Sequence, residues 1–319
     1  MDFQFGFFTI IVSITKLFIL MAIGYFLHMR KFIDDKFTDM LSLLLVRVFF
    51  PALIISKTIS NFSFTEYSYW WILPLSAMIF SVVGMVAGKI VHSFWLKGFG
   101  LSREFMCSCG FQNCGYLPMN LILFSFAGAV GDKLLVYLFL FILGFNVIMW
   151  SLVPLFLKGG IKKGFKLQVL FNPPVVATVF SLIWVALMGK GSLPNIVAAP
   201  IEQLGQASFS IAMITLGSYL CRYKAHDLTE KKPIIASVVT KLFIFPVIVL
   251  SVLRVVPLDM SYKFFLFLQA TMPAAVSLVV IGSYTGANNE FFSRSIFYTH
   301  VVAILSVPLW LYVFKMIII

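Results

Sequence analysis

The stretch that decides the fold is Phe111–Pro118, which reads FQNCGYLP within a long apolar run. A second stretch of the same kind, Leu268–Pro273, reads LQATMP. Each places amide or hydroxyl side chains near a proline, which removes one backbone donor and disrupts the helical bond to residue i−4. Unpaired backbone groups are tolerated at membrane depth only inside protein or beside a water-filled cavity. Two interrupted apolar helices therefore indicate a secondary transporter with its site at the interruptions.

The composition predicts an all-α integral membrane protein. Hydrophobic residues make up 61% of the chain and charged residues 11%, against about 45–50% and roughly 25% in soluble domains. The 319 residues are long enough for ten spans of about 20 residues each, with no room for a soluble domain. The first apolar run has no basic segment before it and no cleavage site after it, so we expect it to be a retained helix.

Apolar runs separated by charged breaks predict ten transmembrane helices. The expected spans are 6–27, 40–58, 70–91, 104–126, 134–157, 172–189, 196–220, 234–256, 262–285 and 291–314. Because the connections are short, we expect one membrane transport domain over residues 1–319.

The distribution of basic residues predicts the orientation. Fifteen of the 24 basic residues fall in or beside the loops after spans 1, 3, 5, 7 and 9. Since cytoplasmic loops carry the excess of lysine and arginine, these loops are expected inside and both termini outside the membrane. The net charge of +12 then reflects topology and contact with anionic lipid, and not nucleic-acid binding.

Proline spacing indicates an internal repeat. Pro118 and Pro154 are 36 residues apart, and Pro273 and Pro308 are 35 apart. Each half, about 1–157 and about 158–319, then holds five spans. Tandem repeats with an odd number of spans insert with opposite orientation, so we expect two inverted five-helix repeats whose broken helices 4 and 9 cross.

The crossing supplies the candidate substrate site. Pro118 and Pro273 are expected to mark the helix breaks, with Gln112 and Asn113 on one break and Gln269 and Thr271 on the other, all four offering side-chain hydrogen bonds. The ends of broken helices attract ions, anions at N-termini and cations at C-termini. The alternative is a pair of proline kinks whose amides bond between helices.

Three cations lie inside expected spans. Arg47 is expected to bind a substrate carboxylate through its guanidinium fork, with snorkelling toward the cytoplasmic face as the alternative. Lys16 and Lys241 are read as structural or as paired with a carboxyl group. Asn146 in span 5 is a further substrate-binding candidate, with an interhelical hydrogen bond as its alternative.

Carboxylates are absent from the middle of every span. Unbalanced buried positive charge is expensive, so the three cations favour an anionic substrate, such as a carboxylate. The coupling ion stays open between H+ and Na+. No cofactor, metal site or catalytic group is expected, since Cys107-x-Cys109 lacks zinc-ligand spacing and no nucleophile–base pair is evident.

Three motifs carry a family resemblance. LVRVFFPALI at Leu45–Ile54, Asn113-x-Gly115-x-x-Pro118, and Asn172-Pro173-Pro174 resemble the auxin efflux carrier family, whose bacterial members are described as malate or malonate permeases. Its architecture is related to that of bile acid:sodium symporters. The resemblance implies a scaffold from spans 1, 2, 6 and 7, a transport domain from spans 3–5 and 8–10, and an elevator-like movement between them.

One departure limits the transfer of substrate contacts. The second break carries Thr271-Met272 before its proline, where plant carriers would be matched better by asparagine, and auxin itself is not the expected substrate. We therefore expect a secondary active transporter for a small organic anion in the cell membrane, that of a bacterial inner membrane. A channel or a ligand-sensing receptor on the same scaffold is the alternative, and a homodimer remains open.

Overall fold

The computed structural model describes residues 7–126, 128–158, 173–222 and 231–318, and within them it is helical without a strand. The elements are α1 (Phe7–Met29), α2 (Asp35–Leu44), η1 (Leu45–Phe49), α3 (Phe50–Asn61), α4 (Ile72–Trp95), α5 (Ser102–Gly110), α6 (Tyr116–Ser125), α7 (Gly128–Leu157), α8 (Pro173–Met188), α9 (Asn195–Arg222), α10 (Lys231–Val239), η3 (Thr240–Ile244), α11 (Phe245–Val255), α12 (Met260–Ala270), α13 (Ser277–Thr285) and α14 (Asn289–Ile318).

The expected all-α membrane class is confirmed. In the described part of the chain, six helices or continuous helical runs are long and apolar enough to cross a membrane: Asp35–Asn61, Ile72–Trp95, Gly128–Leu157, Asn195–Arg222, Lys231–Val255 and Asn289–Ile318. Each of the ten expected spans overlaps at least one helix. The inverted arrangement of ten spans stays a prediction.

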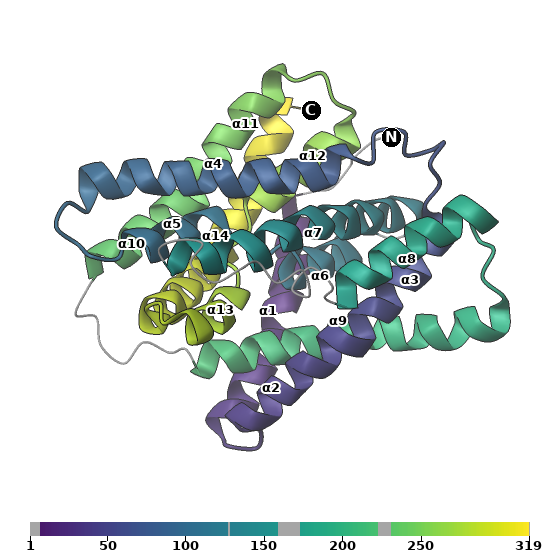
Figure 1. Cartoon of the computed structure of the whole chain (residues 1–319), viewed down its shortest axis with the longest axis horizontal. Helices are drawn as coiled ribbons and strands as arrows, with labels where there is room; N and C mark the ends of the chain where they lie inside the picture. Colours follow the sequence, from purple (N-terminus) through teal and green to yellow (C-terminus); the bar gives the residue numbers. More distant parts are fainter. Residues whose placement is uncertain (1–6, 127, 159–172, 223–230, 319) are drawn as a thin grey trace.

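The helices lie in two groups around a central pair (Figure 1). Helices α2, α3, α8 and α9 lie on one side of the molecule, and α4, α5, α10 and α13 on the other, with α6 and α7 between them. Helix α1 packs along α9, and α3 packs against both α8 and α9. On the other side α4 packs against α5 and α7, and α10 against α14. The expected division into scaffold and transport domain stays a prediction.

Glycines allow α1 and α9 to approach backbone to backbone. A Cβ built on Gly217 would lie 1.8 Å from Met21 O, and one built on Gly24 would lie 2.1 Å from Ile214 O. Both distances are far below van der Waals contact, so only glycine fits either position. Small residues serve this purpose in membrane helix pairs, where dispersion contacts rather than hydrophobic burial drive association.

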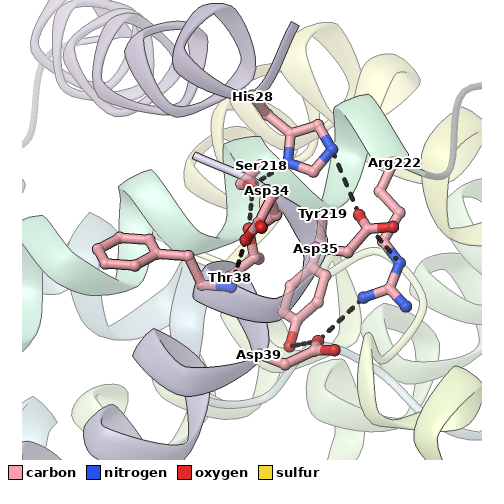
Figure 2. Close-up of polar contacts among 9 residues, drawn as sticks. His28, Asp34, Asp35, Thr38, Asp39, Ser218, Tyr219 and Arg222 are labelled. Atoms are coloured by element: carbon pink, nitrogen blue, oxygen red, sulfur yellow. Dashed lines mark hydrogen bonds and ion pairs between the residues drawn. The ribbon is translucent and has the colours of Figure 1, made fainter. Parts of the chain in front are cut away.

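A polar network ties the ends of α1, α2 and α9 together (Figure 2). Ser218 Oγ lies 2.7 Å from His28 Nδ1 and 2.6 Å from Thr38 Oγ1. Arg222 Nη1 donates to Asp39 Oδ1 at 2.9 Å. Because Thr38 and Ser218 are fully buried, their mutual hydrogen bond satisfies hydroxyls that would otherwise be costly to desolvate.

Two helices contain a π-helical turn just before a proline. The turn η1 precedes Pro51, and η3 precedes Pro246. At the end of each, the cap amide donates to the carbonyl five residues back, from Phe50 to Leu45 and from Phe245 to Thr240. Proline cannot donate and its ring crowds the carbonyl at i−4, so the widened turn absorbs the mismatch. Such π-bulges frequently occur at functional sites.

Candidate functional site

The two helix breaks, residues 111–115 and 271–276, pair through a short antiparallel bridge. We refer to the paired breaks and the helix ends beside them as the crossing. Asn113 N–H donates to Pro273 O at 2.7 Å, and Ala275 N–H donates to Phe111 O at 3.0 Å. The first break separates α5 from α6, and the second separates α12 from α13. The backbone groups freed by each break are thus satisfied in part by the other, which makes an interruption tolerable inside protein at membrane depth.

The prolines do not mark the breaks in the same way. Pro273 lies within the second break, as expected, but Pro118 lies in the first turn of α6, after the break. Pro118 therefore lies at the start of the helix that follows the break, and its expected role as a marker of the break stays a prediction. Amides in the first turn of a helix have no intrahelical acceptor, so proline costs nothing there and favours starting a helix.

Asn113 is held in place on both ends of its amide. Its Nδ2 lies 3.0 Å from His300 Nε2, and its Oδ1 accepts from Tyr116 N–H at 3.2 Å. Since an amide nitrogen only donates, His300 Nε2 is the acceptor, and its Nδ1 donates to Ile296 O at 2.8 Å. His300 thus fixes the orientation of Asn113.

The remaining crossing residues are fully buried. Gln269 Nε2 donates to Cys114 O at 3.4 Å, and Thr271 Oγ1 donates to Leu268 O at 2.8 Å. The side-chain oxygen of Gln269 and the side-chain nitrogen of Gln112 are buried without a hydrogen-bond partner in the described part of the chain. Unpaired buried polar atoms are rare and call for a physical explanation.

A cavity of about 160 Å³ lies beside the crossing. Its lining combines η1, α3 and α8 on one side with the crossing and α7 on the other: Val46, Phe50, Ile54, Gln112, Asn113, Cys114, Gly115, Tyr116, Met119, Phe139, Ile142, Phe145, Asn146, Trp150, Pro174, Ala275, Val276 and Ser277. The first turns of α6 and α13 both reach this one cavity. Two helix N-termini, each with a partial positive charge, therefore converge on it.

The cavity is apolar with a few amides. None of its lining residues carries a charge, and its polar side chains include Gln112, Asn113 and Asn146. Trp150 Nε1 donates to Asn146 Oδ1 at 3.3 Å, which turns the amide nitrogen of Asn146 away from the indole. Small-molecule sites have this character, with an apolar lining and few polar groups that fix orientation.

The structure brings together only part of the expected site. Gln112, Asn113 and Asn146 line the cavity, whereas Gln269 and Thr271 lie behind it within the crossing. Arg47 is exposed and is not among the residues that line the cavity, so its expected contact with a substrate carboxylate stays a prediction. Its neighbours Val46 and Phe50, four residues apart, line the cavity. Because each residue turns a helix by about 100°, Arg47 does not share the face on which these two residues lie.

Lys16 and the Asn172-Pro173-Pro174 motif, both singled out in the sequence, differ in their relation to the cavity. Lys16 is exposed, with its ammonium 5.9 Å from the centroid of the Phe124 ring. Asn172 lies outside the described residues, but Pro174 of the same motif lines the cavity.

Lys241 lies at the crossing, a position that was not predicted from the sequence. Its side chain is fully buried, and its Nζ donates to Cys109 O, at the end of α5, at 3.0 Å. In the sequence, Lys241 lies five residues before Pro246 in an apolar run, and in the structure this position falls on the π-helical turn η3.

The sequence of the chain matches a known family of membrane proteins. The sequence model of the family described as "Membrane transport protein" matches residues 9–163 and 160–311. The chain belongs to this family, the auxin efflux carrier family expected from the motifs. It is therefore a multi-pass membrane transport protein and not an enzyme.

Two of the relatives that resemble this chain are named as transporters. An uncharacterized transporter of Methanocaldococcus jannaschii is 23% identical over 92% of this chain and 94% of its own length. An uncharacterized transporter of Methanothermobacter thermautotrophicus is 24% identical over 93% and 96%, respectively. Protein PIN-LIKES 7 of Arabidopsis thaliana is 19% identical over 46% of this chain and 41% of its own length.

Proposed function

We propose that this chain is a secondary transporter that binds a small organic anion in the cavity beside the crossing. The observation that carries the proposal is the convergence of the first turns of α6 and α13 on one cavity. Helix N-termini favour anions by about 0.3–1 kcal/mol each, and by up to about 2 kcal/mol in partly buried sites. Three residues with side-chain amides, Gln112, Asn113 and Asn146, also line the cavity, and an amide nitrogen can donate to a carboxylate.

The lining also favours a particular kind of substrate. The cavity is smaller than the roughly 300–1,000 Å³ of sites for drug-sized ligands, and its walls include Phe139, Phe145 and Trp150. A short organic acid fits these properties, since its carboxylate meets the helix ends and amides while its carbon chain contacts aromatic walls. A cation would meet two positive helix ends and no carboxylate among the lining residues.

The proposed cycle is an elevator-like alternating access. The cavity lies between η1, α3 and α8 on one side and the crossing with α7 on the other. Movement of the crossing helices against the first group would carry the bound anion from one face of the membrane to the other, since the crossing holds both helix N-termini. Expected partners are the anion, membrane lipid and one coupling ion.

Filling the cavity should block transport without unfolding the protein. A Cβ at Gly115 would meet only Ile142 Cδ1, at 3.7 Å, and Gly115 has a φ of −109° that other residues adopt. Gly115→Leu is expected to lower carboxylate uptake into proteoliposomes by at least tenfold, because its side chain takes the substrate's space. Gly115→Ala, the matched control, should retain most uptake. Equal uptake by both variants would place the substrate elsewhere.

A further inference from the structure

Lys241 is a buried lysine without a carboxylate partner among the described residues. Its Nζ lies 3.0 Å from Cys109 O, 3.5 Å from Gln112 Oε1 and 4.9 Å from the centroid of the Phe245 ring. The described ion pairs do not include it. An isolated buried charge is costly unless polar partners replace its hydration, so these three contacts have to supply the compensation.

The crossing itself creates the acceptor at Cys109. In a continuous helix this carbonyl would accept from the amide four residues on, which is Asn113 N–H. That amide donates instead to Pro273 O at 2.7 Å. Cys109 O is therefore a carbonyl at the C-terminal end of α5, where the partial charge is negative and favours a cation.

Carriers with broken helices use such carbonyl ends to coordinate a coupling cation. Here the ammonium of Lys241 lies at that end, from η3 of a different helix, and the Phe245 ring adds a cation–π contact. A carbonyl end of a broken helix and an aromatic face together form suitable surroundings for a monovalent cation. Here a side chain of the protein itself, Lys241, occupies that position.

Gln112 connects this cation to the cavity. Because an ammonium has only donors, the side-chain oxygen of Gln112 must face Lys241, which leaves its amide nitrogen for another acceptor. That nitrogen is buried without a hydrogen-bond partner in the described part of the chain, although Gln112 lines the cavity. An unpartnered buried donor beside a cavity fits a ligand that brings an acceptor.

We propose that Lys241 is the built-in cation of the crossing. It takes the position that a coupling metal ion would occupy at the carbonyl end of α5, and it holds Gln112 so that the amide nitrogen can donate to an anion. Transport therefore requires no Na+. The part concerning the anion rests on the proposed function, whereas the part concerning the cation does not.

Thermal unfolding of the purified protein in NaCl and in choline chloride of equal ionic strength tests the cation assignment. Wild type should show no saturable Na+-specific rise in its unfolding midpoint. Lys241→Ala should unfold at a lower temperature and gain a saturable rise with Na+ or Li+, because the carbonyl end is then free to bind a metal ion. Lys89→Ala, at an exposed position of α4, is the control and should behave as wild type.

A second variant and the wild-type measurement keep the test decisive if Lys241→Ala does not fold. Lys241→Met keeps the length of the side chain without its charge and should also gain Na+ dependence. If neither variant folds, the wild-type comparison decides, since a saturable Na+ shift in wild type overturns the proposal and its absence supports it. Folded variants that gain no response to Na+ or Li+ also overturn it.

A second experiment tests the role of Gln112 in anion binding independently of the role of Lys241. Gln112→Leu is expected to weaken carboxylate binding at least tenfold in a thermal-shift titration while leaving the Na+ response of wild type unchanged. If wild type binds no carboxylate but Lys241→Ala gains a Na+ response, the proposed anion transport fails and the cation assignment stands. Unchanged carboxylate affinity in Gln112→Leu overturns the role of Gln112.

Discussion

Replacing Asn113 by leucine is expected to raise the half-saturating concentration of the transported anion by about ten- to hundredfold. Asn113 lines the cavity at the crossing, and a hydrogen bond to a charged group contributes about 1.5–3 kcal/mol. The change also leaves His300 Nε2 and Tyr116 N–H without their partner. Concentration-dependent uptake into proteoliposomes measures the effect.

Asn120→Leu is the matched control for this variant. Asn120 is a fully buried asparagine of α6 whose Nδ2 donates to Tyr116 O at 2.7 Å, and it does not line the cavity. It should lose stability comparably while keeping the substrate affinity. The same loss of affinity in both variants would mean that Asn113 acts only through folding.

Replacing Gly217 by alanine is expected to prevent stable packing of α1 on α9. The new methyl carbon would lie 1.8 Å from Met21 O, a backbone atom that cannot move aside without separating the helices. Overpacking usually costs about 1–3 kcal/mol, and a clash with backbone belongs at or above the top of this range. The measurement is the monodisperse fraction and the unfolding midpoint in detergent.

Gly100→Ala provides the comparison, because a Cβ there has nothing within 4 Å. Its unfolding midpoint should equal that of wild type. A Gly217→Ala protein as stable as Gly100→Ala would contradict the close approach of α1 and α9.

The crossing was predictable because its chemistry is local. Proline, glycine and amides in the middle of an apolar run conflict with a continuous helix, and both breaks occur in the two segments that carry this conflict. The position of the first break was not predictable from Pro118, since proline fits the first turn of a helix as readily as it ends one. The bridge from Asn113 to Pro273 depends on pairing between segments far apart in sequence.

The direction in which a side chain points was not available from the sequence. Arg47, Lys16 and Lys241 look alike as charges within apolar runs, yet only Lys241 among these three is buried, and it reaches the carbonyl end of α5. In a helix that is apolar all round, periodicity does not identify the buried face. The π-helical turns also shift that face, so Val46 and Phe50 reach the cavity where Arg47 was expected.

Counterflow in proteoliposomes tests the central claim most directly. A thermal-shift screen with mono- and dicarboxylates first selects a ligand, since a bound ligand raises the unfolding midpoint by mass action. Vesicles loaded with that unlabelled anion should then accumulate the labelled anion transiently, saturably and without Na+, and Gly115→Leu should abolish the accumulation. Unsaturable flux far above about 10³ molecules per second, beyond ordinary turnover numbers, would indicate a channel. Binding without counterflow would indicate a receptor, and either result would contradict a carrier with its site at the crossing.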